Sequence, residues 1–429
     1  MKQIEGYELS RKALESSNAF RAFSASPEIE SRVREICDAV KNEGDAALLR
    51  FEREYSCPTL SAQTLRVSPE EIEAAWRSTP LAAQRALQRA AKNIEAFHGA
   101  QPRANWSFTS PDGATLGQRY TPLERVALYA PHGRAAYPST VLMLAMPARV
   151  AGVQQIVLAS PANKNGDAHP AILAAAHVAG ISEIYKIGGA QAMAALAYGT
   201  ATVSKVDKLV GPGSIYVTLA KKHLYGVVGI DGLYGPSEVV VLADAASPQN
   251  PTQLAADLIA QAEHGADSFV CFVTTSAQLC DSVLQEIETQ VAASAREEYL
   301  TGSLENSLAL ITSTLDEALA LCDLAAAEHV EVWSENAENI AEKIKHSGAI
   351  FLNTPVPLGD YILGPSHTLP TGATARFASG VAVDTFLKRS SIISAPKAAI
   401  ASLAEDLSTL AGMEELPGHG NAARIAAGM

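Results

Sequence analysis

Short apolar runs alternate with alanine-rich helical segments through most of the chain. One series of runs lies at residues 126–130, 155–160, 183–188 and 208–210, and a second at 239–243, 269–274, 307–311, 330–333 and 349–352. Strand-length runs separated by helices are typical of βαβ units with a mostly parallel sheet. The pattern therefore predicts an α/β fold of two tandem Rossmann-like, incomplete, parallel-sheet domains.

The two ends of the chain follow a helical pattern instead. Residues 27–100 are expected to be helical, because Ser68-Pro69-Glu70-Glu71, for example, has the features of a helix start. The tail from about Leu387 is also expected to be mostly helical, and the Gly-rich residues 229–238 to cross between the two units. The predicted division is an N-terminal extension (1–26), a larger α/β domain (27–128 with 237–385), a Rossmann-like domain (129–236) and a helical C-terminal arm (386–429).

Composition narrows the class of protein. The five cysteines are scattered and never spaced as C-x-x-C, which fits reduced thiols in the cytoplasm. The net charge of −13, with no basic cluster to offset it, disfavours nucleic-acid binding. No signal-peptide pattern opens the chain, and the most apolar stretch, 141–160, is interrupted by Pro147 and Arg149. We therefore expect a cytoplasmic protein that binds a small ligand and no membrane.

Four residues are candidate ligands of one divalent metal. Gln261 and His264 stand three apart at the end of a predicted helix, so their side chains point the same way. Asp360 and His419 add a carboxylate and a second imidazole from distant segments. Such donors suit Zn²⁺ and tolerate Mn²⁺ or Co²⁺, and a weak amide ligand favours a substrate-holding metal over a structural one. The alternative is that His264, directly before Gly265, caps the helix.

The irregular segment 359–371 carries an acid, a histidine and several hydroxyls. Such a density of polar groups suggests a functional loop. His367 is a candidate to support the metal ligand Asp360 from behind, although either residue could instead cap a turn.

Glu328 and His329 place an acid and a base side by side at the start of a predicted strand. If the strand begins there, the two side chains point to opposite faces, and one of them can serve a cleft. The alternative is a solvated glutamate and a buried core histidine.

Three loops rich in glycine follow strand candidates directly. They are Tyr129-Ala130-Pro131-His132-Gly133-Arg134, Gly188-Gly189-Ala190-Gln191 and Gly211-Pro212-Gly213-Ser214. Loops at the carboxyl ends of parallel strands offer free backbone N–H groups to ligands. None matches G-x-G-x-x-G, so each alone is equally consistent with an ordinary turn.

Eight segments spread along the chain carry a resemblance to a known family. They are 136–143 (AYPSTVLM), 188–200 (GGAQAMAALAYGT), 206–217 (VDKLVGPGSIYV), 229–231 (GID), 235–238 (GPSE), 261–265 (QAEHG), 328–329 (EH) and 359–371 (GDYILGPSHTLPT). Together they resemble the histidinol dehydrogenase family over nearly the whole length. The resemblance implies a zinc enzyme that oxidises L-histidinol to L-histidine through the aldehyde with two NAD⁺, in the last steps of histidine biosynthesis.

The resemblance also implies roles for single residues. Gln261, His264, Asp360 and His419 match the ligands of one zinc ion per subunit, which holds the substrate's nitrogens. His329 matches the general base and Glu328 the residue that activates water; His329 also contacts the substrate. Ser237 and Glu414 match further substrate contacts, with Glu415 as an alternative to Glu414, and Tyr129, Gln191 and Ser214 match positions that touch NAD. Such enzymes are homodimers in which the C-terminal arm of one subunit completes the other's site.

Three positions depart from the family's usual residues. Ser214 stands where the family usually has Asn, Pro131-His132-Gly133 replaces the usual Pro-Gly-Gly, and Tyr234 precedes Gly-Pro-Ser-Glu where Ala is common. The first two bear on NAD binding and the third on the width of the substrate pocket. The alternatives are therefore a related enzyme that oxidises another polar alcohol, such as a sulfonated diol, a zinc hydrolase, and a metal-bound scaffold without activity.

Overall fold

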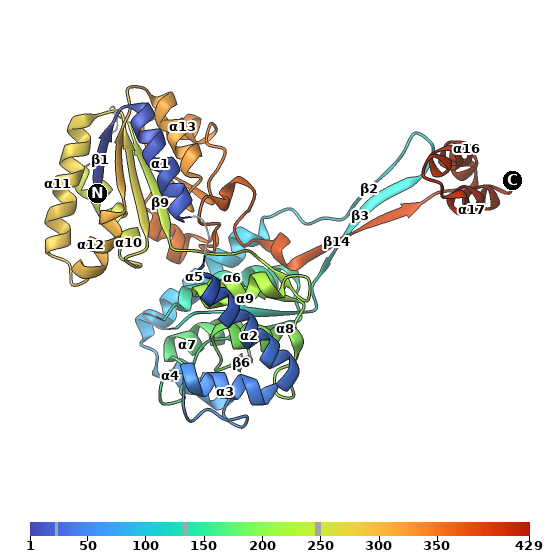
Figure 1. Ribbon diagram of the computed structural model, residues 1–429, viewed down its shortest axis with the longest axis horizontal. Coiled ribbons are helices and arrows are strands. Elements are labelled where there is room, and N and C mark those ends of the chain that lie inside the picture. The colour runs from blue at the N-terminus through green and yellow to red at the C-terminus, as the bar shows by residue number, and fades with distance from the viewer. Residues whose placement is uncertain (22–24, 133–135, 245–249) are drawn as a thin grey trace. The chain divides into compact units, whose positions relative to one another are not determined.

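The computed structural model describes residues 1–21, 25–132, 136–244 and 250–429, which form two compact units (Figure 1). The first comprises Met1–Gly99 with Glu124–Thr385, and the second Ala100–Leu123 with Phe386–Met429. Gly133 and Arg134 of the first glycine-rich loop lie outside the described residues. Among the described residues, no helix has both the length and the apolarity needed to cross a bilayer.

A six-stranded, all-parallel sheet forms one half of the first unit, in the order β1-β11-β10-β9-β12-β13. Its strands are β1 (Lys2–Glu5), β9 (Glu238–Ala243), β10 (Phe269–Thr274), β11 (Leu308–Ile311), β12 (His329–Trp333) and β13 (Ala349–Leu352). The sequence thus predicted all of these strands except β1, which lies in the expected N-terminal extension. The central strands are buried on both faces, which explains why they are continuous apolar runs.

Helices cover both faces of this sheet (Figure 1). The alternation of side chains along β9 divides the core of this sheet in two. Val239 and Val241 pack with α10 (Pro251–Ala262), α11 (Ala277–Ala292) and α12 (Glu297–Glu305). Val240 and Leu242 pack with α1 (Tyr7–Arg21), α13 (Leu315–Ala325) and α14 (Ala337–Ala341). Each buried aliphatic side chain of this kind stabilises the fold by about 1.5–3 kcal/mol.

A five-stranded parallel sheet forms the other half of the first unit, in the order β6-β5-β4-β7-β8. Its strands are β4 (Arg125–Tyr129), β5 (Gln155–Ala159), β6 (Glu183–Tyr185), β7 (Lys208–Val210) and β8 (Gly229–Ile230). One face packs against α2 (Pro27–Glu43), α3 (Asp45–Tyr55), α8 (Gly189–Tyr198) and α9 (Ile215–Leu224). The two parallel sheets confirm the predicted α/β fold.

Helix α6 (Pro138–Ala151) contacts β4 and β5; α5 (Leu81–Gly99) and α7 (Pro170–Ala179) pack against it, and α4 (Pro69–Ser78) packs on α7. The Ser68 side chain accepts from the backbone of Glu71, and Glu71 accepts in return from Ser68, so the predicted start of α4 is a capping box. Helices α2 and α3, which the predicted division assigned to the larger domain, share a core with the five-stranded sheet. The domain boundaries themselves stay a prediction.

The second unit holds an antiparallel sheet and a helical pair. Strands β14 (Leu387–Ser394), β3 (Thr115–Pro122) and β2 (Trp106–Thr109) pair in that order, and α16 (Lys397–Met413) packs on α17 (Pro417–Ala427). The tail is mostly helical, as expected, but it begins with a strand. That strand escaped prediction because β3, its only partner among the described residues, lies far upstream in the sequence.

Candidate active site

A cavity of about 430 Å³ lies within the first unit, between its two sheets. Ser237, Glu328 and His329 reach it from the amino ends of β9 and β12, and Gln261 and His264 from the end of α10. Asp360 reaches it from a π-helical turn, Gly359–Leu363, that follows α15 (Val356–Leu358). We call this space the acid–base cavity. Three of the four predicted metal ligands and both predicted proton-transfer residues line it.

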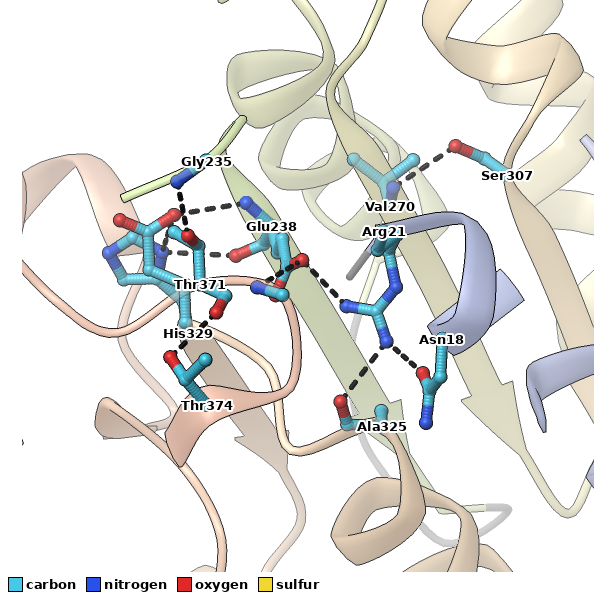
Figure 2. Close-up of polar contacts among 12 residues, drawn as sticks. Asn18, Arg21, Gly235, Glu238, Val270, Ser307, Ala325, His329, Thr371 and Thr374 are labelled. Carbon is cyan, nitrogen blue, oxygen red and sulfur yellow. Dashed lines mark hydrogen bonds and ion pairs between the residues drawn. The ribbon is translucent and has the colours of Figure 1, made fainter. Parts of the chain in front are cut away.

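Glu328 and His329 face the same cavity rather than opposite sides of a sheet. The strand begins at His329, so Glu328 lies before the alternating geometry starts, and its Oε2 is 3.7 Å from His329 Nδ1. The backbone of one residue, Glu238, forms a hydrogen bond with each of the two side chains. The N–H of Glu238 donates to Glu328 Oε2 at 3.0 Å, and His329 Nδ1 donates to the carbonyl of Glu238 at 3.1 Å (Figure 2). A carbonyl can only accept, so neutral His329 keeps its lone pair on Nε2.

Asp360 joins the other groups of the cavity. Its Oδ1 is 3.2 Å from His329 Nε2, and its Oδ2 accepts from the Gln261 amide at 3.0 Å. His367 Nδ1 donates to the Asp360 backbone carbonyl at 2.8 Å, and its Nε2 lies 3.0 Å from the Thr140 hydroxyl. His367 therefore stands behind Asp360, where a supporting residue is expected, and its role stays a prediction.

Burial and charge set the protonation of the three central groups. Burial raises the pKa of Glu328 to about 8, against the opposing effect of His329. Burial works against a charged His329, but Asp360 and Glu328 outweigh it and raise the pKa of His329 to about 9. Burial also disfavours the Asp360 carboxylate, yet His329 keeps the pKa of Asp360 below its ordinary value. His329 is consequently a strong proton acceptor next to a charged carboxylate.

The donors of the acid–base cavity fit a zinc ion only in part. An amide, an imidazole and a carboxylate are available from Gln261, His264 and Asp360, and this mixture of nitrogen and oxygen donors suits zinc. Within the described residues, however, no three His, Cys, Asp or Glu side chains are grouped so that they could hold a metal. His419 and Glu414 belong to the second unit, where both are exposed on the helical pair. A complete tetrahedral zinc site needs a fourth ligand in addition to Gln261, His264 and Asp360.

A second cavity, of about 750 Å³, lies at the carboxyl ends of the five-stranded sheet. All three glycine-rich loops contribute to its walls or to its base, so we call it the glycine-loop cavity. Tyr129, Gln191 and Ser214, the predicted NAD contacts, line it. Ser214 and His132 line both cavities, which therefore adjoin. Gly211 has φ +123°, and a Cβ there would stand 2.4 Å from the Tyr129 carbonyl, so this loop requires glycine.

Polar side chains hold the backbone of the second loop in place. Buried Glu52 accepts from the backbone N–H of Gly188 at 2.8 Å and from the Gln191 amide at 3.1 Å. The Tyr129 hydroxyl accepts from the N–H of Gly189 at 3.3 Å. Gln191 and Tyr129 are thus buried and engaged within the loop, whereas Ser214 is exposed. Buried side chains therefore fix the backbone conformation of this loop.

Three residues of these networks escaped the sequence analysis. Glu52, and Arg21, whose Nη1 lies 2.8 Å from Glu238 Oε1, are on amphipathic helices, where nothing distinguishes a buried charge from a solvated one. Glu238 closes the Gly-Pro-Ser-Glu segment and is the first residue of β9, so a charged residue at the start of an apolar strand was the available signal.

Known proteins resemble the chain over nearly its full length. The family described as histidinol dehydrogenase has a sequence model that matches residues 20–427. Histidinol dehydrogenase from Moorella thermoacetica is 48% identical over 400 residues, covering 92% of this chain and 94% of that protein. The Synechococcus sp. protein of that name is 46% identical over 399 residues, covering 92% of each. A crystal structure of histidinol dehydrogenase from Elizabethkingia anophelis, 34% identical, gives a TM-score of 0.93 and covers 99% of this chain and 98% of its own.

Proposed function

Since the chain belongs to the histidinol dehydrogenase family, we propose that its acid–base cavity oxidises L-histidinol to L-histidine, with His329 and Glu328 as the proton-transfer residues. The family consists of NAD-dependent oxidoreductases of histidine biosynthesis that use zinc. The observation that carries the assignment of roles is the convergence of Glu328, His329 and Asp360 on one cavity.

His329 suits the base of both oxidation steps. Its Nδ1 is fixed by the Glu238 carbonyl, so the neutral imidazole has its lone pair on Nε2 and can take the proton of a substrate hydroxyl. Loss of that proton and of a hydride turns the alcohol into the aldehyde. Glu328, ionised, then takes a proton from the water that attacks the aldehyde carbon, while His329 returns its proton to the carbonyl oxygen, which completes the gem-diol and restores the base. The resulting gem-diol loses a second proton to His329 and a second hydride, which yields the carboxylic acid.

Gln261, His264 and Asp360 would hold the zinc ion, with His419 as the fourth ligand. When bound, zinc supplies an anchor for the substrate's nitrogens and NAD accepts the hydride. Ser237 lies on the wall of the same cavity. Glu414 would supply a counter-charge for the substrate ammonium. These residues orient the substrate, so that the hydroxyl faces His329.

The glycine-loop cavity would hold NAD. Its position at the carboxyl ends of parallel strands, with loops that present backbone N–H groups, suits a dinucleotide. Tyr129 and Gln191 would act by shaping the Gly188–Gly189 turn through Glu52, and exposed Ser214 would meet the cofactor where the two cavities adjoin. The nicotinamide is expected at that junction.

A homodimer would bring His419 and Glu414 to the cavity of the partner subunit. The helical pair exposes an apolar face that suits a second copy of this chain: Leu403, Leu407 and Leu410 follow helical spacing on α16. Met413 at the end of that helix is 78% exposed. The five buried, unpaired cysteines agree with a cytoplasmic location for this enzyme.

The reaction is tested by incubating the zinc-loaded protein with L-histidinol and NAD⁺ while NADH absorbance and histidine are measured. We expect two NADH for each histidine formed. No NADH from L-histidinol, with turnover of another polar alcohol, would overturn the assignment of substrate.

Subunit sharing is tested by mixing two inactive variants, His329→Asn and His419→Asn. If the arm crosses to the partner, mixed dimers contain one intact site, and activity returns after the subunits are exchanged. The control is each variant exchanged with itself. Mixed dimers that remain inactive would contradict the shared site.

A further inference from the structure

One buried residue, Glu238, touches both proton-transfer residues through its backbone. Its N–H donates to Glu328 and its carbonyl accepts from His329, as described above. The position of the Glu238 backbone at the start of β9 therefore sets the direction of both side chains. Neither Glu328 nor His329 can turn without losing a hydrogen bond inside a buried site.

The Glu238 side chain is held by a buried ion pair (Figure 2). Its Oε1 lies 2.8 Å from Nη1 of Arg21, and the two side chains are 3% and 5% exposed. The same oxygen accepts from the backbone N–H of Gly372 at 2.8 Å. Burial raises the pKa of Glu238, and Arg21 opposes that effect. Arg21 is thus the positive charge that partly offsets the cost of burying this carboxyl group.

Arg21 is in turn fastened to the segment that leads to Glu328. Its Nη2 donates to the carbonyl of Ala325 at 3.1 Å, three residues before Glu328, and also contacts the Asn18 side chain (Figure 2). The guanidinium lies over the Phe269 ring of β10, 4.4 Å from its centroid. One side chain from α1 therefore connects the end of α13 with the starts of β9 and β10.

The loop around Gly372 connects the same pair to the wall of the acid–base cavity. Thr371 lines that cavity, and its hydroxyl accepts from the N–H of Gly235 at 2.6 Å. Glu238 thus binds a loop beside the substrate as well as the proton-transfer residues. All of these contacts lie within the first unit.

We propose that Arg21 and Glu238 form a positioning pair that holds Glu328 and His329 in their reactive geometry. Buried ion pairs add little to stability compared with apolar residues of the same volume, so a gain in stability alone is a weak reason for such a pair. Holding two reacting side chains in a fixed direction is a sufficient reason for the pair, because small displacements of reacting groups strongly reduce reaction rates. The inference rests on the proposed roles of Glu328 and His329.

The test compares Arg21→Met, Arg21→Lys and the double variant Arg21→Met/Glu238→Gln in the full-length, zinc-loaded enzyme. For Arg21→Met we expect kcat to fall about 10- to 100-fold, with KM for L-histidinol and NAD⁺ nearly unchanged. Lysine keeps the charge but cannot bond to Glu238 and Ala325 with the planar fork of arginine, so kcat should recover in part.

The double variant separates positioning from stability. It removes both charges, while the amide oxygen of the introduced glutamine keeps an acceptor for the N–H of Gly372, so its melting temperature should return toward that of the wild type and its kcat should stay low. If kcat recovers together with stability, or if Arg21→Met keeps the wild-type kcat, the pair is only a stability element. If Arg21→Met does not fold, the lysine and double variants decide.

A matched control is Arg125→Met, which breaks the ion pair of Arg125 with Glu183 in the five-stranded sheet. It should lower the melting temperature and leave kcat unchanged. Failure of the proposed function is distinguishable, because the wild type would then not oxidise L-histidinol or His329→Asn would remain active. Activity lost in His329→Asn but kept in Arg21→Met contradicts the positioning pair alone.

Discussion

The two cavities of the first unit use charged side chains in opposite ways. In the acid–base cavity, Glu328, His329 and Asp360 face the space and one another at the amino ends of the six-stranded sheet. In the glycine-loop cavity, the only charged side chains among the described lining residues are the cations Arg32 and Lys164, and the acidic residue, Glu52, is buried beneath the wall and bonds to the loop that forms it. The first arrangement supplies groups that exchange protons. The second supplies a backbone surface.

This difference follows from what each ligand requires. An alcohol that is oxidised must lose a proton, so an ionisable group has to reach the reacting atom. A dinucleotide can be bound by backbone N–H groups, which need only a fixed loop. The position of each cavity agrees: the glycine-loop cavity lies at carboxyl ends of strands, the usual place for such loops, whereas the acid–base cavity depends on residues at strand starts.

The largest expected effect is on the acid–base side. We expect His329→Asn to lower kcat by about 10²- to 10⁴-fold, because asparagine can keep the contact with Glu238 but cannot accept a proton. Zinc content, measured by mass spectrometry, and the dissociation constant for NAD⁺, measured by calorimetry, should not change. A large loss of NAD⁺ affinity in this variant would show that the two cavities are not separate in function.

The second expected effect is on the stability of the glycine-loop side. Burial raises the pKa of Glu52 to about 8, although Gly188 and Gln191 oppose the rise. The folded protein therefore keeps a proton that the unfolded chain releases near its ordinary pKa of 4.5. The resulting stabilisation is complete below pH 4.5 and is lost as the pH rises toward 8. The pH dependence of stability that Glu52 causes should disappear in Glu52→Gln, because glutamine keeps an acceptor for the N–H of Gly188 and carries no charge.

Denaturant unfolding at pH 5 and pH 8 measures this effect. The unfolding free energy of Glu52→Gln, taken relative to that of the wild type, should rise by on the order of 3 kcal/mol from pH 5 to pH 8. Glu52→Ala is the matched control, because it also removes the charge but leaves the N–H of Gly188 without its acceptor; it should be less stable than Glu52→Gln and bind NAD⁺ more weakly. An equal pH dependence in wild type and Glu52→Gln would contradict the buried, protonated state.

The sequence foretold the acid–base cavity better than the network that supports it. Gln261, His264 and Asp360 carry side chains that are unusual at their positions, and all three reach one cavity. Glu52, Arg21 and Glu238 could not be recognised in the same way. Each is an ordinary residue type whose importance comes from burial and from a partner distant in the sequence.

The fold shows the same limit. Strands such as β5 and β10 were predicted because apolar runs reveal strands that are buried in a parallel sheet. Strand β14 pairs with β3 in a ribbon whose side chains are mostly exposed or half-buried, so no apolar run marked it. Local pattern reveals burial, and it does not reveal which distant segments pair.

The smallest expected effect concerns the link between the two cavities. Tyr234 lines the acid–base cavity, and its hydroxyl donates to Asp231 Oδ2 at 3.0 Å. The same oxygen accepts from the N–H of Gly211 at 2.7 Å, in the loop that ends at Ser214. Buried Lys221 completes the group, because its Nζ lies 2.5 Å from Asp231 Oδ1 and 2.9 Å from the Gly211 carbonyl.

Tyr234→Phe removes one hydrogen bond from this group and leaves the ion pair and the ring in place. We expect a loss of about 1 kcal/mol in unfolding free energy, the usual net value of one such bond. Because Asp231 holds the Gly211 loop as well, KM should rise slightly for both L-histidinol and NAD⁺, while kcat stays close to that of the wild type. A change confined to L-histidinol would mean that Tyr234 acts only as a wall of the acid–base cavity and that the Asp231 group transmits nothing between the two sites.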